Sequence, residues 1–264
     1  MSRLLKILIL LCAICTFAGS ASAALVDWST LTWPAGSLSN SYDVDAGSAG
    51  NDVTMTISGD TGQLQPSTVA GAPQTPAITR AFDGGLGTSP HTLELALNLT
   101  SNAQSVTFTL DFSALYAAGV AYVSFTLFDI DANNIGGSTY EDLISSIYAT
   151  SITGTQIAPT ITNVGSHVSL TGSGLTQVLT GQSSSNDLGA GSDLSNATIT
   201  FNATDIRSIT FTYGSGSLFA DPTYQHIGIY NLDYTIVPEP GALGICLMVA
   251  GLATWTSRRR ARTR

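Results

Sequence analysis

Hydrophobic and polar residues alternate with a period of two in several segments of the chain. The clearest is segment 92–100, where apolar side chains take every second position: Leu93, Leu95, Leu97 and Leu99. Segments 53–57, 106–112 and 199–213 show the same alternation. Because alternate residues of a β-strand lie on one face of the sheet, these segments predict half-buried strands.

The order of these segments also predicts how the strands pair. Segments 92–100 and 106–112 are separated by a short turn, which predicts that they form a hairpin. Segments 199–201 and 209–213 predict a second hairpin around Thr204–Asp205 for the same reason.

The remaining sequence adds one strand and little helix. Ile227–Val237 predicts a final strand, and Ser113–Ala118 and Tyr140–Ile147 predict single helical turns. The proline-rich segment Gly59–Gly87 predicts a long irregular connection or a binding loop. Short strands without long helices predict an all-β fold, a jelly-roll-like β-sandwich of two sheets over residues 24–236.

The N-terminus has the three parts of a secretion signal. Arg3 and Lys6 provide positive charge, Ile7–Phe17 is apolar, and Ala21-Ser22-Ala23 is a small-residue cleavage site. The sequence therefore predicts a signal peptide over residues 1–23 and a mature chain that begins at Ala24. A retained span is the alternative, although the apolar stretch is short for it.

The C-terminus, residues 237–264, also has three consecutive parts. A Pro-Glu-Pro turn ends the preceding strand, since two prolines remove backbone donors; it comprises Pro238, Glu239 and Pro240. Gly241–Ser257 follows without a charged residue, and its 17 residues are near the shortest length that spans a bilayer as a helix. The tail carries Arg258, Arg259, Arg260, Arg262 and Arg264. These arginines predict a cytoplasmic stop, which leaves the chain before Gly241 outside the cytoplasm.

This C-terminal arrangement resembles the PEP-CTERM sorting signal of Gram-negative bacteria. The resemblance covers only the tail and rests on the motif, the span and the arginines in that order. It implies recognition by an exosortase, transient membrane anchoring, processing, and delivery to the cell surface or extracellular polymer matrix. A stable single-span anchor without processing is the alternative. The second half of the preceding body also loosely resembles the β-sandwich body of many proteins with this signal, on Gly119–Asp131, the Tyr140–Ile144 turn and Gln225–Tyr234.

The body of the chain is strongly acidic. The whole chain has 18 Asp and Glu residues, and all of them except Glu239 lie within Ala24–Val237. These 17 acidic residues stand against two cationic ones, Arg80 and Arg207, so the body has a formal charge of −15. This charge argues against nucleic acid as a partner and leaves room for divalent cations. The body contains no cysteine, so it has no disulfide framework.

The densest acidic segment ends the predicted strand that begins at Val123. Asp129 and Asp131 are two residues apart, so in extended chain both leave the same face, and Asn133 continues it. Oxygen ligands at this spacing suit Ca²⁺, which predicts a calcium site at Asp129, Asp131 and Asn133. Glu141 and Asp142 follow a Gly-Gly turn that can fold them back toward this segment. The alternative is an ordinary polar turn.

No catalytic motif is evident. The histidines His91, His167 and His226 stand apart, and no zinc-binding or nucleophile-elbow pattern occurs. The acidic residues do not single out a pair for glycoside hydrolysis. Trp28 and Trp33 belong to no strand pattern and are the aromatic residues we expect to be available for stacking on sugars; the tyrosines fit core or interstrand positions.

These observations predict a non-enzymatic, exported protein of the cell surface or of a biofilm-associated exopolysaccharide matrix, with an exosortase, the membrane and exopolysaccharide as partners. A carbohydrate-binding module is the first alternative, and a secreted hydrolase is the second. The sequence does not identify a ligand-binding residue.

Overall fold

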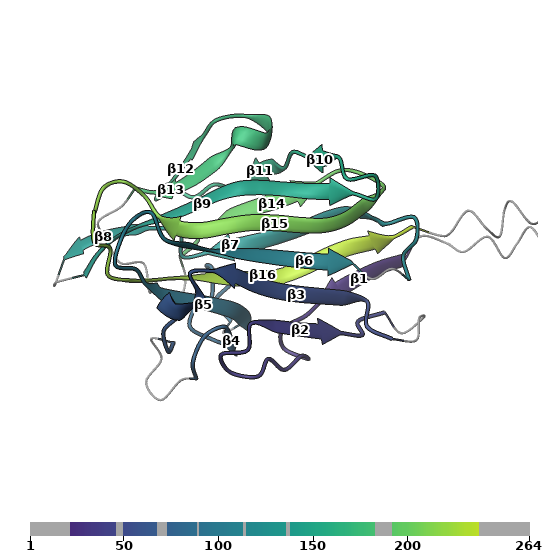
Figure 1. Ribbon diagram of the computed structural model, residues 1–264, viewed down its shortest axis with the longest axis horizontal. Helices are drawn as coiled ribbons and strands as arrows, with labels where there is room; N and C mark the ends of the chain where they lie inside the picture. Colours follow the sequence, from purple (N-terminus) through teal and green to yellow (C-terminus); the bar gives the residue numbers. More distant parts are fainter. Residues whose placement is uncertain are drawn as a thin grey trace, which may run out of the picture.

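The computed structural model describes residues 22–45, 50–67, 73–88, 90–112, 115–135, 138–182 and 192–237. The described chain consists of strands and two short 3-10 helices, η1 (Thr61–Gln63) and η2 (Gly174–Thr176) (Figure 1). The first eight strands are β1 (Ser22–Val26), β2 (Ser39–Tyr42), β3 (Val53–Gly59), β4 (Ala77–Thr79), β5 (Thr92–Asn98), β6 (Ser105–Phe112), β7 (Val120–Phe128) and β8 (Ala132–Ile135). The others are β9 (Ser138–Ser151), β10 (Gln156–Ile157), β11 (Thr160–Thr162), β12 (Val168–Thr171), β13 (Val178–Gly181), β14 (Ala197–Phe201), β15 (Ile206–Ser215) and β16 (Tyr224–Ile236).

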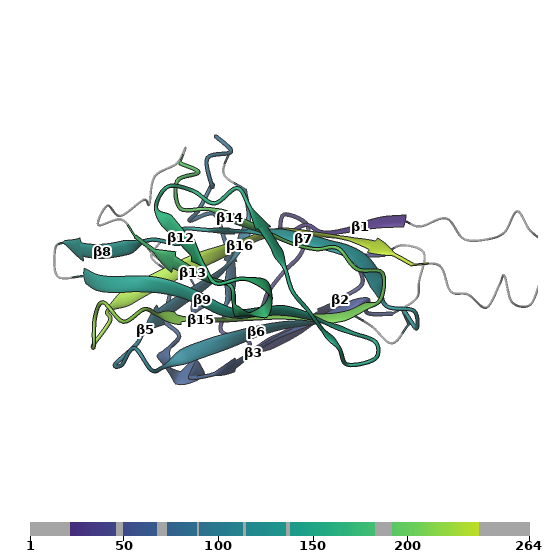
Figure 2. The same ribbon diagram turned by 90° about the horizontal axis from the view of Figure 1, so that it is seen from above.

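The strands form two antiparallel layers that face one another (Figure 2). In the first sheet the pairing runs β2-β3-β6-β15-β9-β13-β12. In the second it runs β11-β14-β7-β16-β5-β4, with β1 beside the end of β16. One residue pair, Ile206 with Val120, joins β15 to β7 and makes the two layers continuous. The all-β prediction is confirmed, and the layers form a β-sandwich.

Both predicted hairpins are wrong. β5 pairs with β16 and β4 in the second sheet, whereas β6 pairs with β3 and β15 in the first. β14 and β15 are likewise in different sheets. The turns between these strands therefore cross from one layer to the other. Alternation shows which side chains face the core, but a strand has the same alternation whichever neighbour it pairs with.

Most individual strand predictions are confirmed, while one helical prediction is wrong. β3, β5, β6 and β16 match the predicted segments within a few residues. Tyr140–Ile147, predicted as a helical turn, lies within the long strand β9. The described part of Ser113–Ala118 is a turn closed by the bond from the Gly119 N–H to the Tyr116 carbonyl at 2.8 Å, not a helix.

The core between the layers is aromatic and aliphatic. Phe211 of the first sheet stacks on Phe108 of the same sheet at a centroid distance of 5.1 Å and on Phe125 of the second sheet at 6.0 Å. Phe112 and Tyr234 make a similar contact between the layers at 5.0 Å. Because the segment between Ala24 and Val237 has no cysteine, burial of these side chains provides the main stabilisation of the fold.

The two ends of the described sandwich lie together. Ser22 of β1 is paired with Ile236 of β16, so the chain enters and leaves at the same end (Figure 1). Ala24, the predicted mature N-terminus, lies within β1. Most of the predicted signal peptide, the motif Pro238–Pro240, the predicted span and the arginine tail lie outside the described residues. Within the described ranges no helix is long and apolar enough to cross a membrane.

Candidate functional site

The connection between β3 and β5 covers part of the outer face of the second sheet. We call residues 60–67 and 73–88 of this connection the strap. β4, within the strap, pairs with β5, and Thr75 adds a second attachment: its hydroxyl accepts a bond from the Ala96 N–H at 3.1 Å and donates to the Gln65 carbonyl at 2.7 Å. The Gln65 N–H donates to the Ala96 carbonyl at 3.0 Å. The irregular connection predicted from sequence is therefore tightly held in the part that the structure describes.

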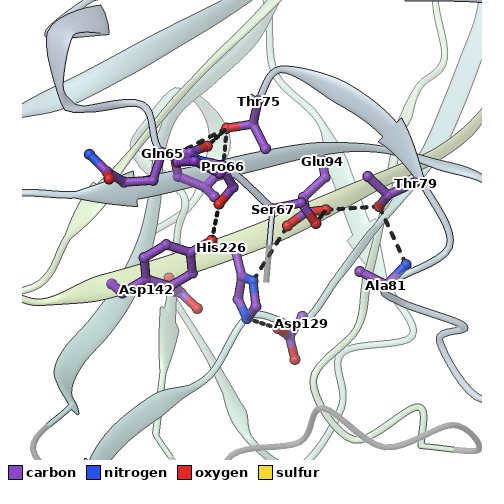
Figure 3. Close-up of polar contacts among 12 residues, drawn as sticks. Gln65, Pro66, Ser67, Thr75, Thr79, Ala81, Glu94, Asp129, Asp142 and His226 are labelled. Carbon is purple, nitrogen blue, oxygen red and sulfur yellow. Dashed lines mark hydrogen bonds and ion pairs between the residues drawn. The ribbon is translucent and has the colours of Figure 1, made fainter. Parts of the chain in front are cut away.

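Glu94 of β5 is fully buried beneath the strap. Two strap hydroxyls donate to its Oε2, Ser67 at 2.5 Å and Thr79 at 2.8 Å (Figure 3). Burial of a carboxylate is costly unless it is hydrogen-bonded, and the strap supplies both donors to Oε2. Glu94 is on the face of β5 opposite Leu93 and Leu95, so the strap and not the main core buries it.

His226 of β16 extends this contact to a second carboxylate. Its Nδ1 lies 3.6 Å from Glu94 Oε1, and its Nε2 lies 3.3 Å from Asp129 Oδ2 (Figure 3). The edge of Phe82, from the strap, packs against the imidazole at a centroid distance of 4.8 Å. The imidazole therefore lies between two buried carboxylates, one from β5 and one from the end of β7.

The electrostatics of Glu94 reflect these contacts. Burial alone raises the pKa of Glu94, but His226 and the hydroxyls of Ser67 and Thr79 outweigh it, and the pKa is lowered below 4.5. The chain of carboxylate, imidazole and carboxylate resembles acid–base machinery. However, Glu94 is 0% exposed and His226 is 3% exposed, so a substrate cannot reach them beneath the strap. What the arrangement does in this structure is hold the strap to the sheet.

The predicted calcium ligands are buried and reach different contacts. Asp129 follows β7 with a φ of 65°, which breaks the extended conformation, and its carboxylate faces His226. Asp131 instead lies beside Asp142 of β9: its N–H donates to Asp142 Oδ2 at 3.1 Å, and its carbonyl accepts from the Asp142 N–H at 2.9 Å. Asn133 is also buried, on β8 opposite Tyr140. Glu141 and Asp142 do lie back against this segment, as predicted, because β8 pairs with β9.

Asp142 has the opposite pKa shift to Glu94. Burial, and after it the negative charge of Asp131, raise the pKa of Asp142 well above its usual value. The Tyr213 hydroxyl donates to Asp142 Oδ1 at 2.8 Å and offsets part of this effect. Among the described residues, no group of three or more acidic, histidine or cysteine side chains is spaced to hold a metal ion. Calcium binding at Asp129, Asp131 and Asn133 stays a prediction.

The outer face of the first sheet is open and carries rows of hydroxyl groups. The pairing register places one row across five strands: Ser39, Thr56, Thr109, Thr210 and Tyr148. A second row holds Ser41, Thr54, Asp111, Ser208 and Thr150, and a third holds Ser58, Thr107, Thr212 and Ser145. We call these three rows the hydroxyl face. Neighbouring strands are about 4.8 Å apart, so each row is a regular line of polar groups.

Several of these hydroxyls already contact one another. Ser41 and Thr54 are 2.8 Å apart, and Thr107 and Thr212 are 3.3 Å apart. The side chains are half-buried or exposed, and no other labelled element lies over β3, β6 and β15 in Figure 1. They therefore form a fixed surface rather than a set of free side chains.

The hydroxyl face is almost without charge. Its one carboxylate is Asp111. Burial raises the pKa of Asp111, and the nearby Arg207 offsets part of this rise. The acidic residues of the body thus lie mostly at loops, at strand ends or in the buried network, and not on this face. A charge-poor face in a body of formal charge −15 suits an uncharged partner.

The aromatic residues are placed differently from our expectation. Trp28 and Trp33 are 1% and 7% exposed and belong to the core, so they are not available for stacking on a ligand. Tyr148, by contrast, ends a hydroxyl row on the outer face and is half-buried. The sequence contained a signal for this position, because Tyr148 alternates with the buried residues Ile147 and Ala149 of β9.

Comparison with known proteins finds distant similarities only. No protein-family model and no curated protein matches the chain. Among solved structures, the chain is similar to CBM28, a carbohydrate-binding module specific for non-crystalline cellulose (11% identity, 67% of this chain and 88% of that one, TM-score 0.35). It is also similar to TmCBM27, a module that recognises mannan (10% identity, 83% and 99%, TM-score 0.35). A third similarity is to the N-terminal domain of the Streptococcus gordonii adhesin Sgo0707 (10% identity, 69% and 42%, TM-score 0.33). At these TM-scores the similarities carry no argument about ligand or function.

Proposed function

We propose that the protein is a non-catalytic module that binds an uncharged polysaccharide through the hydroxyl face, as an exported component of the cell surface or of the extracellular polymer matrix. The observation that carries the proposal is the three rows of hydroxyls held in register on an open, charge-poor sheet. Sugar hydroxyls both donate and accept hydrogen bonds, and so do those of Ser and Thr. Tyr148 adds an aromatic side chain with an apolar ring and a polar end, which suits a sugar surface.

The energetics favour a polymer over a small sugar. A single hydrogen bond exchanged with water contributes only about 0.5–1.5 kcal/mol, so one sugar unit on a flat face binds weakly. A polymer that lies along a row makes many such contacts for one loss of translational freedom, and its apparent affinity rises accordingly. The open shape of the face, which does not enclose a ligand, fits this mode of binding.

The test measures retention of residues 24–236 in native gels that contain mixed-linkage β-glucan, galactomannan, arabinoxylan or dextran, with alginate as the charged control. We expect retardation by at least one uncharged polymer and none by alginate. The triple variant Thr56→Val, Thr109→Val and Thr210→Val removes one row of hydroxyls while keeping β-branched side chains, and it should lose most of the retardation.

The matched control places serine at the same three positions, which keeps the hydroxyls. It should bind like the parent. Equal retardation of the parent and the valine variant would place binding elsewhere, and retardation by alginate alone would contradict an uncharged ligand.

Export and sorting remain part of the proposal. The basis is the sequence: a secretion signal at one end and the Pro-Glu-Pro, apolar and arginine-rich segments at the other. If an exosortase processes the chain, mass spectrometry of the surface fraction should detect no peptide from Leu243–Arg264. An intact Arg264 terminus in that fraction would favour the stable anchor instead.

Calcium is also proposed at Asp129, Asp131 and Asn133. A cation there would relieve the repulsion between Asp131 and Asp142, which raises the pKa of Asp142. A ligand that binds only the folded state stabilises it by about 2.7 kcal/mol at a hundredfold excess over its Kd. The melting temperature of the parent should then rise from EDTA to millimolar Ca²⁺, and this rise should vanish in Asp129→Asn/Asp131→Asn. Equal melting temperatures of the parent in EDTA and in millimolar Ca²⁺ would contradict calcium binding at these residues.

A further inference from the structure

The second sheet carries a smaller array of the same kind on its outer face, beyond the part that the strap covers. The register across β11, β14 and β7 places Thr162, Thr198 and Thr126 in one row and Thr160, Thr200 and Ser124 in the next. The Thr126 and Thr198 hydroxyls are 3.1 Å apart, and those of Ser124 and Thr200 are 3.0 Å apart. We call these six residues the second hydroxyl face.

The two faces share more than their hydroxyls. Tyr230 of β16 is opposite Thr126 and ends a row of the second face, as Tyr148 ends a row of the first. One side of the Tyr230 ring packs on Phe128 at a centroid distance of 5.0 Å, which fixes its position. Asp233 is the one carboxylate in register with these rows, opposite Ser124. Both faces are therefore uncharged along most of their length and suit the same kind of ligand.

Their positions on the sandwich are opposite. The first sheet is in front in Figure 1 and the second is behind it, and Figure 2 shows the two layers from their edge. A straight stretch of polymer bound to one face cannot reach the other, since it would have to turn around the edge of the sandwich. When both faces are occupied, the second ligand must come from another chain or from a distant part of the same chain.

We propose that the protein cross-links uncharged polysaccharide chains by binding one on each hydroxyl face. This inference rests on the proposed function and adds the second site and the bridging activity. It commits to polysaccharide as the occupant of the second face because that face has the same row geometry, the same terminal tyrosine and the same lack of charge as the first. A second copy of the protein is the alternative occupant, and the test below separates the two.

The experiment is a two-layer capture assay with residues 24–236. Each of the four uncharged polymers is immobilised, the protein is bound, and the same polymer in fluorescent, soluble form is added. The parent should capture the second layer. Thr126→Val/Thr198→Val/Thr200→Val should still bind the first layer, within about threefold of the parent, but capture of the second should fall about tenfold or more. The valine variant of the first face should bind the first layer only weakly, through the smaller second face, and should also fail to capture the second layer.

The controls distinguish the possible failures. Serine at the three second-face positions should restore capture. Combining both valine sets should abolish binding, while circular dichroism and the melting temperature show that the fold is kept. Sedimentation without polymer should find the parent and both variants as monomers. A parent dimer that the second-face valines dissociate would assign that face to self-association and overturn the inference.

Two further outcomes separate this inference from the proposed function. If the parent binds a polymer but captures no second layer, or if the second-face variant captures it as well as the parent does, bridging is wrong and the proposed function stands. If the parent binds none of the four polymers, the proposed function fails and the inference fails with it.

Discussion

The outer face of β3, β6 and β15 is open to solvent, whereas the outer face of β5 and the start of β16 is covered by the strap. Both faces are polar. On the open face the polar groups are hydroxyls that meet water and one another, and on the covered face they are Glu94 and His226, which meet buried partners. The difference shows that polarity on a sheet has two uses here. The hydroxyls stay at the open surface, while the charged groups fasten a connection.

The energetic consequence of this difference is large. An exposed polar group has water as an alternative partner, so its removal changes stability little. A buried carboxylate lacks that alternative, and removing one member of its network leaves the others without compensation. The two faces should therefore respond very differently to the same chemical change, and this is how the comparison can be tested.

Removing the charge of one carboxylate on each face should give the largest difference in stability between the two faces. Glu94→Gln keeps the shape of the side chain but offers one acceptor oxygen to Ser67, Thr79 and His226, and it leaves His226 without one of its two carboxylates. We expect it to lower the free energy of unfolding by about 3 kcal/mol. Asp111→Asn, the matched change on the open face, should stay within about 0.5 kcal/mol of the parent. Urea unfolding at pH 7 measures both.

The pH dependence of the same variant sharpens this test. The folded-state pKa of Glu94 is lowered below 4.5, so its stabilising contribution is present above pH 4.5 and is lost as the pH falls through the folded-state value. The difference between the parent and Glu94→Gln should therefore narrow in acid. A difference that stays constant down to the acid transition would show that the carboxylate charge is not what holds the strap.

The contribution of Asp142 to stability should depend on pH in the opposite sense to that of Glu94. Because the folded-state pKa of Asp142 is raised, the native chain holds a proton there that the unfolded chain releases above pH 3.8. Its contribution to stability then falls as the pH rises toward the folded-state value, by up to about 1.4 kcal/mol per pH unit. Asp142→Asn should abolish this fall, so the stability of the variant should rise relative to that of the parent as the pH increases above 3.8.

This measurement should be made in EDTA, so that a bound cation does not alter the titration. Tyr213→Phe serves as the control, because it removes the hydroxyl that donates to Asp142 and so should raise the pKa of that carboxyl further. The decline in stability should then extend to higher pH. Parallel pH profiles for the parent and Asp142→Asn would mean that Asp142 keeps an ordinary pKa.

The contrast between the faces also explains which features the sequence could predict. Alternation predicted β3 and β6 because each has its apolar side chains on one face. It could not predict that Glu94, flanked by Leu93 and Leu95, is buried, because the strap that covers it is mostly irregular and its one strand, β4, has only three residues. The two hairpin predictions were wrong for a related reason. A turn that crosses between layers and a turn within one layer can have similar lengths and residues.

The acidic segment was recognised, but its geometry was not predictable. The expectation that Asp129 and Asp131 share a face assumed extended chain, and the φ of 65° at Asp129 breaks that assumption. The hydroxyl rows were present in the sequence as threonines that alternate with apolar residues in β3, β6 and β15. Their alignment across five strands depends on the pairing register, which a single strand does not contain.

The smallest expected effect comes from one substitution made on both faces. Thr75→Val in the strap removes the hydroxyl that bonds to the backbone of Ala96 and Gln65, and valine can satisfy neither group. We expect a loss of about 1 kcal/mol. Thr109→Val on the hydroxyl face should change stability by less than about 0.5 kcal/mol, since water solvates its surroundings and valine is as favourable in a strand. Thermal melts of the two variants measure the difference.

Thr109→Ser provides the control for changes in side-chain shape. If Thr109→Val is as destabilising as Thr75→Val, the open hydroxyls serve the fold, and a loss of polysaccharide binding in the valine variants no longer identifies the binding surface. If it is neutral, such a loss reports on the ligand alone.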